Sequence, residues 1–440
     1  MVPGAGQACA DVVSHHAVAR PDRPTELRIF RMGSAGDGVA EGPVHVPGAL
    51  PGEVVTVRLA GRGMAVLEAV KESSPDRVAP PCSHFLEGCG GCAIQHWAMP
   101  AGSAWKRARL TEALSRAGYL DPPVAETLET PPNARRRADL ALRRRPDGTV
   151  AVGFHPRGSA DVLDLRECHV LRPELFALLP PLRALARRLP ALNGRGSAVV
   201  NLLDTGPDVL LRTDGVLDAA GRRLLAAFAA TLGLPRIAWA RGDDSPEVAA
   251  QTGPVRLTLG GVAVTPPPGA FLQASIEGEA AIVGAVLAGL PAKLPARAQV
   301  MDLYCGLGTL SFPLSSRARV TAVEGEVAAH AALDAAARAA GGRVMAIRRD
   351  LARQPMLPAE LKPFAAIVLD PPYAGAADQV AQIARSGVTR VIYVSCNPAA
   401  LARDGAVLRG AGFTVPAATS IDQFRWSAHL ESVVVFARGG

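Results

Sequence analysis

The sequence is poor in aromatic residues and lacks any long apolar segment. Phe, Trp and Tyr make up 4% of its 440 residues, although hydrophobic residues of all kinds reach 49%. No run of about 18 apolar residues occurs, so we expect no membrane-spanning helix. Residues 1–24 have neither a basic start nor a continuous apolar stretch. We therefore expect no secretory signal there, and a disordered tail instead.

The sequence also lacks an even number of cysteines. An odd count without a secretory signal predicts a reducing cytoplasm, with thiols that are reactive or bound to metal. The seven are Cys9, Cys82, Cys89, Cys92, Cys168, Cys305 and Cys396. Cys82, Cys89 and Cys92 form a C-x6-C-x2-C pattern, and Cys168 is a candidate fourth ligand. Four thiolates hold either zinc or an iron–sulfur cluster, and the sequence alone leaves both open.

The charge balance is modestly basic. The net charge is +7, which fits a polyanionic partner such as a nucleic acid without requiring one. Two arginine triplets, Arg135–Arg137 and Arg143–Arg145, lie close together in the chain. They are consistent with a solvated pair of strands or with a surface that contacts phosphates.

Three segments follow the tail. Residues 25–77 contain short strands separated by glycines, which predicts a small five-stranded barrel of the oligonucleotide-binding type. Residues 78–264 begin with the cysteine cluster and predict an α+β central domain. Residues 265–440 alternate strand and helix, which predicts a Rossmann-like α/β domain with ligands at the carboxyl ends of parallel strands. The expected strands are 299–303, 320–323, 344–347, 365–369, 390–394, 413–416 and 432–436, with the last two forming an antiparallel pair at one edge.

A nucleotide-like ligand is predicted at these strand ends. Gly306 and Gly308 follow the first strand, and Ser311 stands where a dinucleotide motif has its third glycine. Glu324 ends the second strand, where an acid accepts hydrogen bonds from ribose hydroxyls. The fourth strand ends in Asp370-Pro371-Pro372-Tyr373, a rigid turn that aims polar groups into the crevice. S-adenosylmethionine therefore fits better than a dinucleotide, with Gly306, Glu324 and Asp370 as candidate contacts.

Cys396 follows the fifth strand and precedes a helix that begins near Pro398. A thiol in this place predicts a nucleophile whose pKa is lowered by the helix amino terminus. Glu431 lies at the start of the last strand, and the antiparallel polarity of that strand brings it to the same crevice. A thiolate and a nearby base are the groups needed to methylate a pyrimidine at C5, through addition at C6 and removal of the C5 proton.

At these residues the chain resembles the RNA uracil-C5 methyltransferase family. The shared motifs are Phe271–Gln273, Asp302–Gly306, Val323–Glu324, Asp370–Pro372, Ser395–Pro398 and His429–Ser432. The resemblance implies that Cys396 is the nucleophile and Glu431 the proton acceptor. It further implies that S-adenosylmethionine contacts Gln273, Tyr304, Glu324 and Asp370. Ser275 and Tyr373 depart from the family pattern, which usually has Asn and Arg there.

The resemblance extends to the rest of the chain. Gly36–Ala40 is similar to part of the TRAM domain, which some members use to bind RNA. Ribosomal-RNA-type members hold a [4Fe-4S] cluster at the positions of Cys82, Cys89, Cys92 and Cys168. We expect a cytoplasmic protein that acts on RNA, with a monomer as the default. By analogy, large-subunit ribosomal RNA is favoured over tRNA.

Three alternatives remain at this point. An amino-group methyltransferase would use the Asp370–Tyr373 turn and need no thiol. A 5-methylcytosine enzyme would need a second cysteine in that turn, which has none. An iron–sulfur RNA-binding factor without activity would need no intact nucleophile and base.

Overall fold

The computed structural model of the protein describes residues 24–439. The tail predicted at residues 1–24 lies outside this range except for its last residue. The chain divides into two compact units at Arg77 and Val78, and each is described by itself. In the described range, no helix combines the length and the apolar character needed to cross a membrane.

The first unit is a small closed barrel. Its strands follow the order β1-β2-β3-β5-β4 around the barrel. They are β1 (Thr25–Met32), β2 (Asp37–Ala40), β3 (Val44–Pro47), β4 (Val54–Gly61) and β5 (Met64–Glu72). Ile29, Val46 and Val55 fill its core. The five strands therefore close on themselves, and the relation of this barrel to TRAM domains stays a prediction.

The second unit begins with a mainly antiparallel sheet of seven strands. Their order is β13-β12-β11-β10-β7-β8-β9, and only β11 and β12 run parallel. The strands are β7 (Arg137–Arg144), β8 (Val150–Phe154), β9 (Leu163–Asp164), β10 (Arg195–Leu203), β11 (Gly206–Thr213), β12 (Arg236–Arg241) and β13 (Glu247–Gln251). The segment also contains α1 (Ser83–Leu86), α3 (Pro173–Phe176), α4 (Leu179–Arg188), α5 (Ala219–Leu232) and the hairpin of β14 (Leu257–Leu259) with β15 (Val262–Val264). Leucines of α4 and α5 pack on this sheet, so the α+β character predicted for the region is present.

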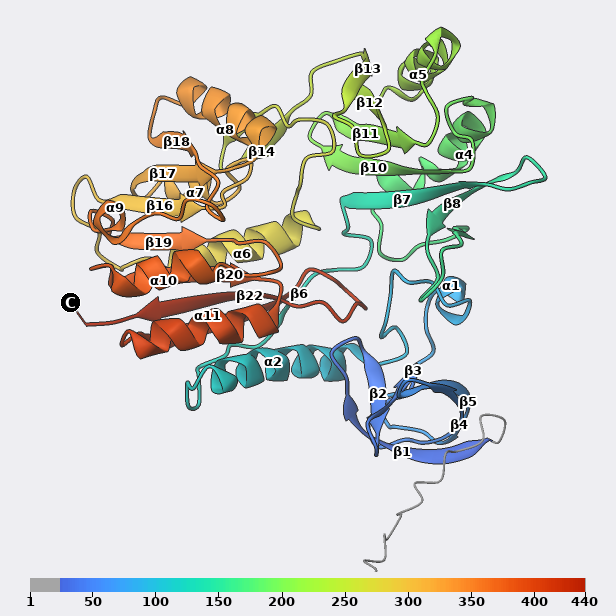
Figure 1. The fold of residues 1–440 in the computed structure, drawn as a ribbon, viewed down its shortest axis with the longest axis horizontal. Coiled ribbons are helices and arrows are strands. Elements are labelled where there is room, and N and C mark those ends of the chain that lie inside the picture. The colour runs from blue at the N-terminus through green and yellow to red at the C-terminus, as the bar shows by residue number, and fades with distance from the viewer. Residues whose placement is uncertain (1–23, 440) are drawn as a thin grey trace, which may run out of the picture. The chain divides into compact units, whose positions relative to one another are not determined.

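An eight-stranded sheet forms the rest of the second unit (Figure 1). Its order is β18-β17-β16-β19-β20-β22-β21-β6, and the first five strands run parallel. The strands are β16 (Gln299–Leu303), β17 (Arg319–Glu324), β18 (Val344–Arg348), β19 (Ala366–Leu369), β20 (Arg390–Ser395), β21 (Thr414–Asp422), β22 (Glu431–Ala437) and β6 (Leu128–Glu129). β22 is antiparallel to both β20 and β21. The predicted strand that ended at Pro416 instead continues to Asp422.

Helices cover both faces of this sheet, because neighbouring strand residues point in opposite directions. Val300 faces one apolar cluster and Met301 the other. The first cluster includes α6 (Ile276–Gly289), α7 (Ser311–Leu314) and α8 (Val327–Ala339). The second includes α2 (Met99–Arg116), α9 (Pro358–Leu361), α10 (Ala377–Arg385) and α11 (Pro398–Gly410). This is the doubly covered parallel sheet that the alternating pattern predicts.

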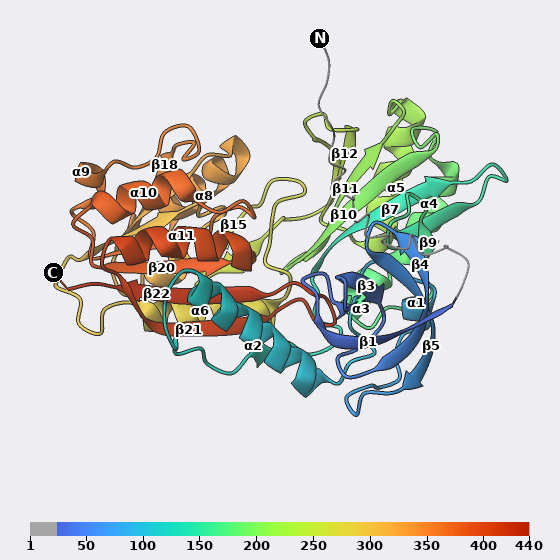
Figure 2. The same ribbon diagram turned by 60° about the horizontal axis from the view of Figure 1, so that its bottom comes forward.

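The helix α2 joins the C-terminal sheet although it precedes the whole central sheet in sequence. It lies beside α11 in both views (Figures 1 and 2), and Leu110 and Leu114 are fully buried there. Lys106 of α2 is also fully buried and donates to Asp422 Oδ1 at 2.5 Å and to the Phe424 carbonyl at 3.1 Å. α2 therefore anchors the loop between β21 and β22, which leads to Glu431.

Candidate active site

Two strand ends bring Cys396 and Glu431 face to face. In the antiparallel pairing of β20 with β22, Ser395 is the register partner of Ser432. Cys396 follows β20 directly, and Glu431 is the first residue of β22. The Ser432 hydroxyl donates to the Ser395 carbonyl at 2.9 Å, which closes the two strands at this point. The predicted nucleophile and the predicted base therefore lie opposite each other.

Within the described residues, only one oxygen of the Glu431 carboxyl group has a hydrogen-bond donor. Its side chain is buried, and Gln423 Nε2 donates to Oε2 at 2.8 Å. Oε1 is buried and makes no hydrogen bond. Burial and the nearby charge of Asp370 raise the pKa of Glu431 to about 8. A carboxyl with a pKa in this range and one uncommitted oxygen has the properties of a general base.

The thiol of Cys396 differs from the prediction. Burial, followed by the charges of Glu431 and Asp370, raises its pKa to about 11. The helix α11 does begin at Pro398, but its N-cap is Asn397, whose side chain accepts from the Ala399 amide at 3.0 Å. The expected lowering of the thiol pKa is therefore wrong, because burial and the two carboxylates outweigh any effect of the helix end. Deprotonation of Cys396 thus requires a change in the charges around it.

A chain of side-chain amides connects Glu431 to Asp370. Gln273 Nε2 donates to Asp370 Oδ2 at 3.2 Å, and Gln273 Oε1 accepts from Gln423 Nε2 at 2.8 Å. Burial raises the pKa of Asp370 to about 6. The structure therefore brings Gln273, Asp370, Cys396 and Glu431 together, as the motifs predict. Gln423, which links them, was missed because nothing in its local sequence marks it.

The loop after β16 forms the neighbouring part of the crevice. Tyr304 and Gly306 both have positive φ angles, of 60° and 54°, and bend the backbone sharply. The Gly306 amide donates to Glu324 Oε2 at 2.8 Å, so the loop and the end of β17 are held together. The loop leads into the single helical turn α7. Ser311, which replaces a third glycine, donates to the fully buried Asp302 at 2.5 Å.

Four carboxyl groups thus gather at the carboxyl ends of the sheet. They are Asp302, Glu324, Asp370 and Glu431. Burial, with added repulsion from Asp370 and Glu324, raises the pKa of Asp302 to about 7. Since the groups oppose each other's ionisation, a positively charged ligand among them would be stabilised. The sulfonium and ammonium groups of S-adenosylmethionine match this requirement, and a dinucleotide pyrophosphate does not.

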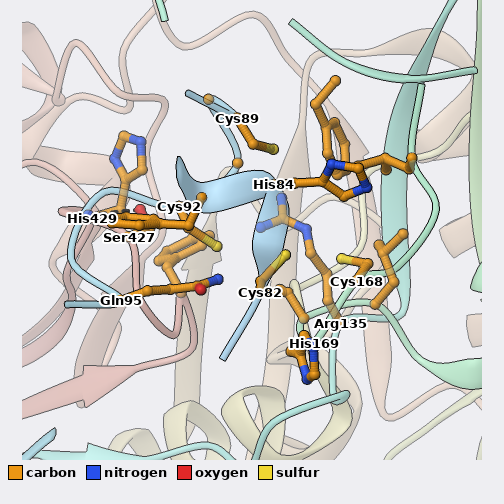
Figure 3. A pocket seen from close by; sticks show the side chains of 18 of the residues that line it. Cys82, His84, Cys89, Cys92, Gln95, Arg135, Cys168, His169, Ser427 and His429 are labelled. Carbon is orange, nitrogen blue, oxygen red and sulfur yellow. Dashed lines mark hydrogen bonds between the residues drawn. The ribbon is translucent and has the colours of Figure 1, made fainter. Parts of the chain in front are cut away.

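A cavity of about 550 Å³ joins Cys396 to the cysteine cluster. Its lining includes Cys82, Cys89, Cys92 and Cys168 together with Cys396, Tyr373 and His429. Figure 3 shows the four cysteines on the cavity wall with Arg135 among them. The predicted metal ligands and the predicted nucleophile therefore open onto one space, although they are far apart in the sequence.

The four clustered cysteines form a donor set that favours a bound cation. Burial raises the pKa of each thiol, to about 12 for Cys92, and the thiols also raise one another's pKa. The positive charge of Arg135 acts in the opposite direction on Cys168. Within residues 24–439, no three His, Cys, Asp or Glu side chains are arranged around a point where one metal ion would fit. A [4Fe-4S] cluster binds each thiolate at a different iron, so its ligands need not converge on one point.

The arginine triplets do not form one phosphate-binding surface. Arg136 is buried, ion-paired with Glu279, and donates from Nε to the Gln273 carbonyl at 3.2 Å. Arg144 donates to the carbonyls of Leu192 at 2.8 Å and Ala186 at 2.7 Å. Of the six arginines, only Arg145 is exposed. Both predictions for the triplets are therefore wrong for Arg136 and Arg144, because these side chains satisfy backbone carbonyls inside the fold.

Comparisons with known proteins agree on one kind of chemistry. Residues 292–439 match the family profile described as tRNA (uracil-5-)-methyltransferase. An uncharacterized RNA methyltransferase of Brucella suis is 40% identical, across 94% of this chain and 98% of its own. The 23S rRNA (uracil(1939)-C(5))-methyltransferase RlmD of Pectobacterium carotovorum is 35% identical, across 95% of each chain.

A solved structure has the same fold over nearly the whole chain. It is the Pyrococcus abyssi tRNA (uracil-54, C5)-methyltransferase in complex with S-adenosyl-L-homocysteine. The TM-score is 0.72 at 20% sequence identity, covering 94% of this chain and 100% of the other. At this identity the likeness establishes the fold.

Proposed function

The chain belongs to the RNA uracil-C5 methyltransferase family, and from this we propose that it transfers a methyl group from S-adenosylmethionine to C5 of a uridine in RNA. The observation that carries the proposal is that Cys396 and Glu431 each lie one residue beyond the register partners Ser395 and Ser432, at the ends of β20 and β22. One side chain is a nucleophile and the other a buried carboxyl with a raised pKa. An amino-group methyltransferase has no use for this pair.

The two residues divide the chemistry between them. Cys396 Sγ, as thiolate, forms a bond to C6 of uracil, and the electron pair of the C5–C6 double bond moves toward C5 and the O4 carbonyl. C5 then forms a bond to the methyl group, whose bond to the sulfonium sulfur of S-adenosylmethionine breaks, so that S-adenosylhomocysteine leaves. The Glu431 carboxylate takes the C5 proton, the double bond reforms, and the S–C6 bond breaks to release the Cys396 thiolate. The oxygen Oε1 of Glu431, which makes no hydrogen bond, is the proposed acceptor.

We further propose that S-adenosylmethionine is held by Gln273, Tyr304, Gly306, Glu324 and Asp370. When bound, it supplies the electrophilic methyl group. The loop of Tyr304 and Gly306 offers backbone groups, and Glu324 lies where a ribose would bind. Asp370 and the neighbouring carboxylates would stabilise the positive charge of the bound sulfonium. That positive charge would in turn offset the repulsion by which the carboxylates oppose ionisation of the Cys396 thiol.

Large-subunit ribosomal RNA is the proposed substrate. The relative RlmD, named for a 23S rRNA uracil, is 35% identical over 95% of this chain. The tRNA-methylating structural neighbour is 20% identical and supports the fold alone. Incubation with unmodified 23S rRNA and unmodified tRNA, with tritiated methyl donor, distinguishes the two. Methylation of tRNA alone would overturn this part of the proposal.

We propose a [4Fe-4S] cluster on Cys82, Cys89, Cys92 and Cys168. Burial and mutual repulsion oppose four free thiolates, and iron binding would remove that opposition. Protein purified without oxygen should be brown and contain about four irons and four sulfides per chain. Cys168→Ser should lose most of the iron. A colourless protein with one zinc per chain would show that the four cysteines hold zinc and would overturn the proposed cluster.

The test of the reaction is a denaturing gel of protein, 5-fluorouridine RNA and S-adenosylmethionine. Fluorine at C5 cannot leave as a proton, so Cys396 should remain bonded to the RNA. A band of slower mobility from wild type, missing with Cys396→Ala, is the expected result. Methyl transfer to ordinary RNA without this band would favour an amino-group methyltransferase that uses the Asp370–Tyr373 turn.

A further inference from the structure

Gln423 occupies a junction that the sequence motifs do not include. It follows β21 and is 5% exposed. Its Nε2 donates to Glu431 Oε2 and to Gln273 Oε1, both at 2.8 Å. Its Oε1 accepts from the Ala274 amide at 3.1 Å. One buried amide therefore contacts the proposed base and both residues of the 273–274 segment.

The hydrogen-bond partners permit only one orientation of this amide. Nε2 faces two oxygens that accept, and Oε1 faces a backbone N–H that donates. Turning the amide over would oppose oxygen to oxygen and N–H to N–H. The same logic fixes Gln273, which accepts from Gln423 and donates to Asp370. The Gln423 amide therefore donates to Glu431, and the Gln273 amide donates to Asp370.

The first turn of α6 packs closely against the side chain of Gln423. A Cβ added at Gly278, in the first turn of α6, would lie 2.5 Å from Gln423 Cβ and 3.0 Å from Gln423 Oε1. The preceding residue, Asp422, is fixed by the buried amine of Lys106. Gln423 is therefore held by its contact with α6 and by its neighbour Asp422, which α2 fixes. Its amide in turn hydrogen-bonds Glu431.

We propose that Gln423 is a positioning residue: it holds Glu431 Oε2 so that Oε1 faces C5 of the bound uracil. The same amide also hydrogen-bonds Gln273, a proposed cofactor contact, and so fixes the base relative to the cofactor site. This inference rests on the proposed function. Gln423 touches no reacting atom in it. Its effect is on the step in which the C5 proton is removed, and the addition of Cys396 to C6 does not depend on it.

The pH dependence offers a readout that a purely structural role would not change. Hydrogen bonding from Gln423 lowers the pKa of Glu431. Removal of this donor should raise that pKa further, so the base-dependent step should need a higher pH. Other ionisable groups on the elements around Glu431 are Asp370, Cys396, His429 and the Lys106–Asp422 pair. None of them is altered in the variants below.

The experiment compares Gln423→Met with a matched control, Gln379→Met. Met keeps the length and removes both hydrogen-bonding groups. Gln379 is also buried; its Oε1 accepts from the Met356 amide at 2.8 Å and its Nε2 donates to the Met356 carbonyl at 3.2 Å, away from the site. Gln423→Met should lower kcat about 10- to 100-fold with KM for RNA within about twofold. Its pH–rate profile should move up by about one unit. Gln379→Met should lower the melting temperature and leave both readouts unchanged.

A second variant tests the same position without removing the amide. Gly278→Ala places a methyl group against Gln423 and should reproduce the loss of kcat and the shifted profile. It also keeps the test decisive if Gln423→Met fails to fold. Wild-type kinetics in either variant would overturn the inference.

The 5-fluorouridine gel separates this inference from the proposed function. Wild type, Gln423→Met and Gly278→Ala should all form the adduct, because Cys396 is intact in each. With ordinary RNA near pH 9, where Glu431 of the wild type is mostly ionised, only Gln423→Met and Gly278→Ala should accumulate a methylated adduct. If wild type forms no adduct with 5-fluorouridine RNA, the proposed function fails. If wild type does and the variants release product from ordinary RNA at the wild-type rate, the positioning role fails alone.

Discussion

The raised pKa of Glu431 predicts how fast the enzyme should release methylated RNA at each pH. A protonated carboxyl cannot accept the C5 proton, so the rate of release should follow the ionised fraction of Glu431. With a pKa of about 8, that fraction rises from about 9% at pH 7 to about 91% at pH 9. Release should therefore accelerate about tenfold over this range, with an inflection near pH 8.

The assay isolates the release step. Enzyme and unmodified RNA are mixed with tritiated methyl donor at pH 6, where Glu431 is mostly protonated and the methylated adduct should accumulate. The sample is then jumped to each final pH and quenched in denaturant, and the labelled adduct is followed on a gel. Since the bond to Cys396 already exists, the high pKa of that thiol does not enter the decay.

Glu431→Gln provides the control. Loss of a general base slows its step by about 10²- to 10⁴-fold, so the adduct should persist at every pH. The reasoning would be refuted by a decay rate that does not change between pH 7 and pH 9 in the wild type. It would be refuted equally by a Glu431→Gln adduct that decays with the same pH dependence.

Three further predictions follow from the same contacts. Cys396→Ala should abolish methylation while changing the Kd for S-adenosylhomocysteine, measured by equilibrium dialysis, less than about twofold; a large loss of affinity would place the thiol in the cofactor site. Asp370→Asn should lower the pKa of Cys396 by about one unit, because one of two opposing charges is gone. The pH dependence of iodoacetamide alkylation measures this, and an unchanged midpoint would contradict it. Lys106→Met should reduce the free energy of unfolding in urea by about 3–5 kcal/mol, since it leaves Asp422 buried without its cation; adding Asp422→Leu should restore most of the loss.

The sequence predicts the strand ends and therefore most of the site. Strand polarity alone brings Glu431 opposite Cys396, because an antiparallel strand starts where its parallel neighbours end. Gln273 lies in the irregular segment before α6 and needed the family motif to be found, since no periodic pattern points to it. The strand predicted to end at Pro416 continues to Asp422 because the proline lies at an irregularity in the register between Thr414 and Ala417.

Long-range contacts account for the features that the sequence did not predict. Gln423 acquires its role from Ala274 and Gln273, which are distant in the chain. Arg136 looked like part of a basic surface, yet it is buried against Glu279. The pKa of Cys396 was given the wrong direction because the helix end is visible in the sequence, whereas the burial that raises this pKa most is not. The pKa of a group at the strand ends depends on the burial and the charges contributed by every strand that ends there. A motif within one strand cannot predict that combined effect.

The pKa values of Asp370 and Glu431 explain why two similar carboxyls take different roles. Burial alone raises the pKa of Asp370, to about 6, whereas Glu431 has burial and the charge of Asp370 against it and reaches about 8. Near neutral pH Asp370 is therefore mainly charged and suited to hold a cation, while Glu431 is mainly protonated and loses its proton as the pH rises. Gln273 donates to Asp370 and Gln423 to Glu431, so each carboxyl receives one N–H from the linked amides. Burial makes Glu431 a stronger base by raising its pKa, but it also disfavours the ionised form that must accept the proton. The hydrogen bond from Gln423 favours the ionised form and so limits the rise in pKa.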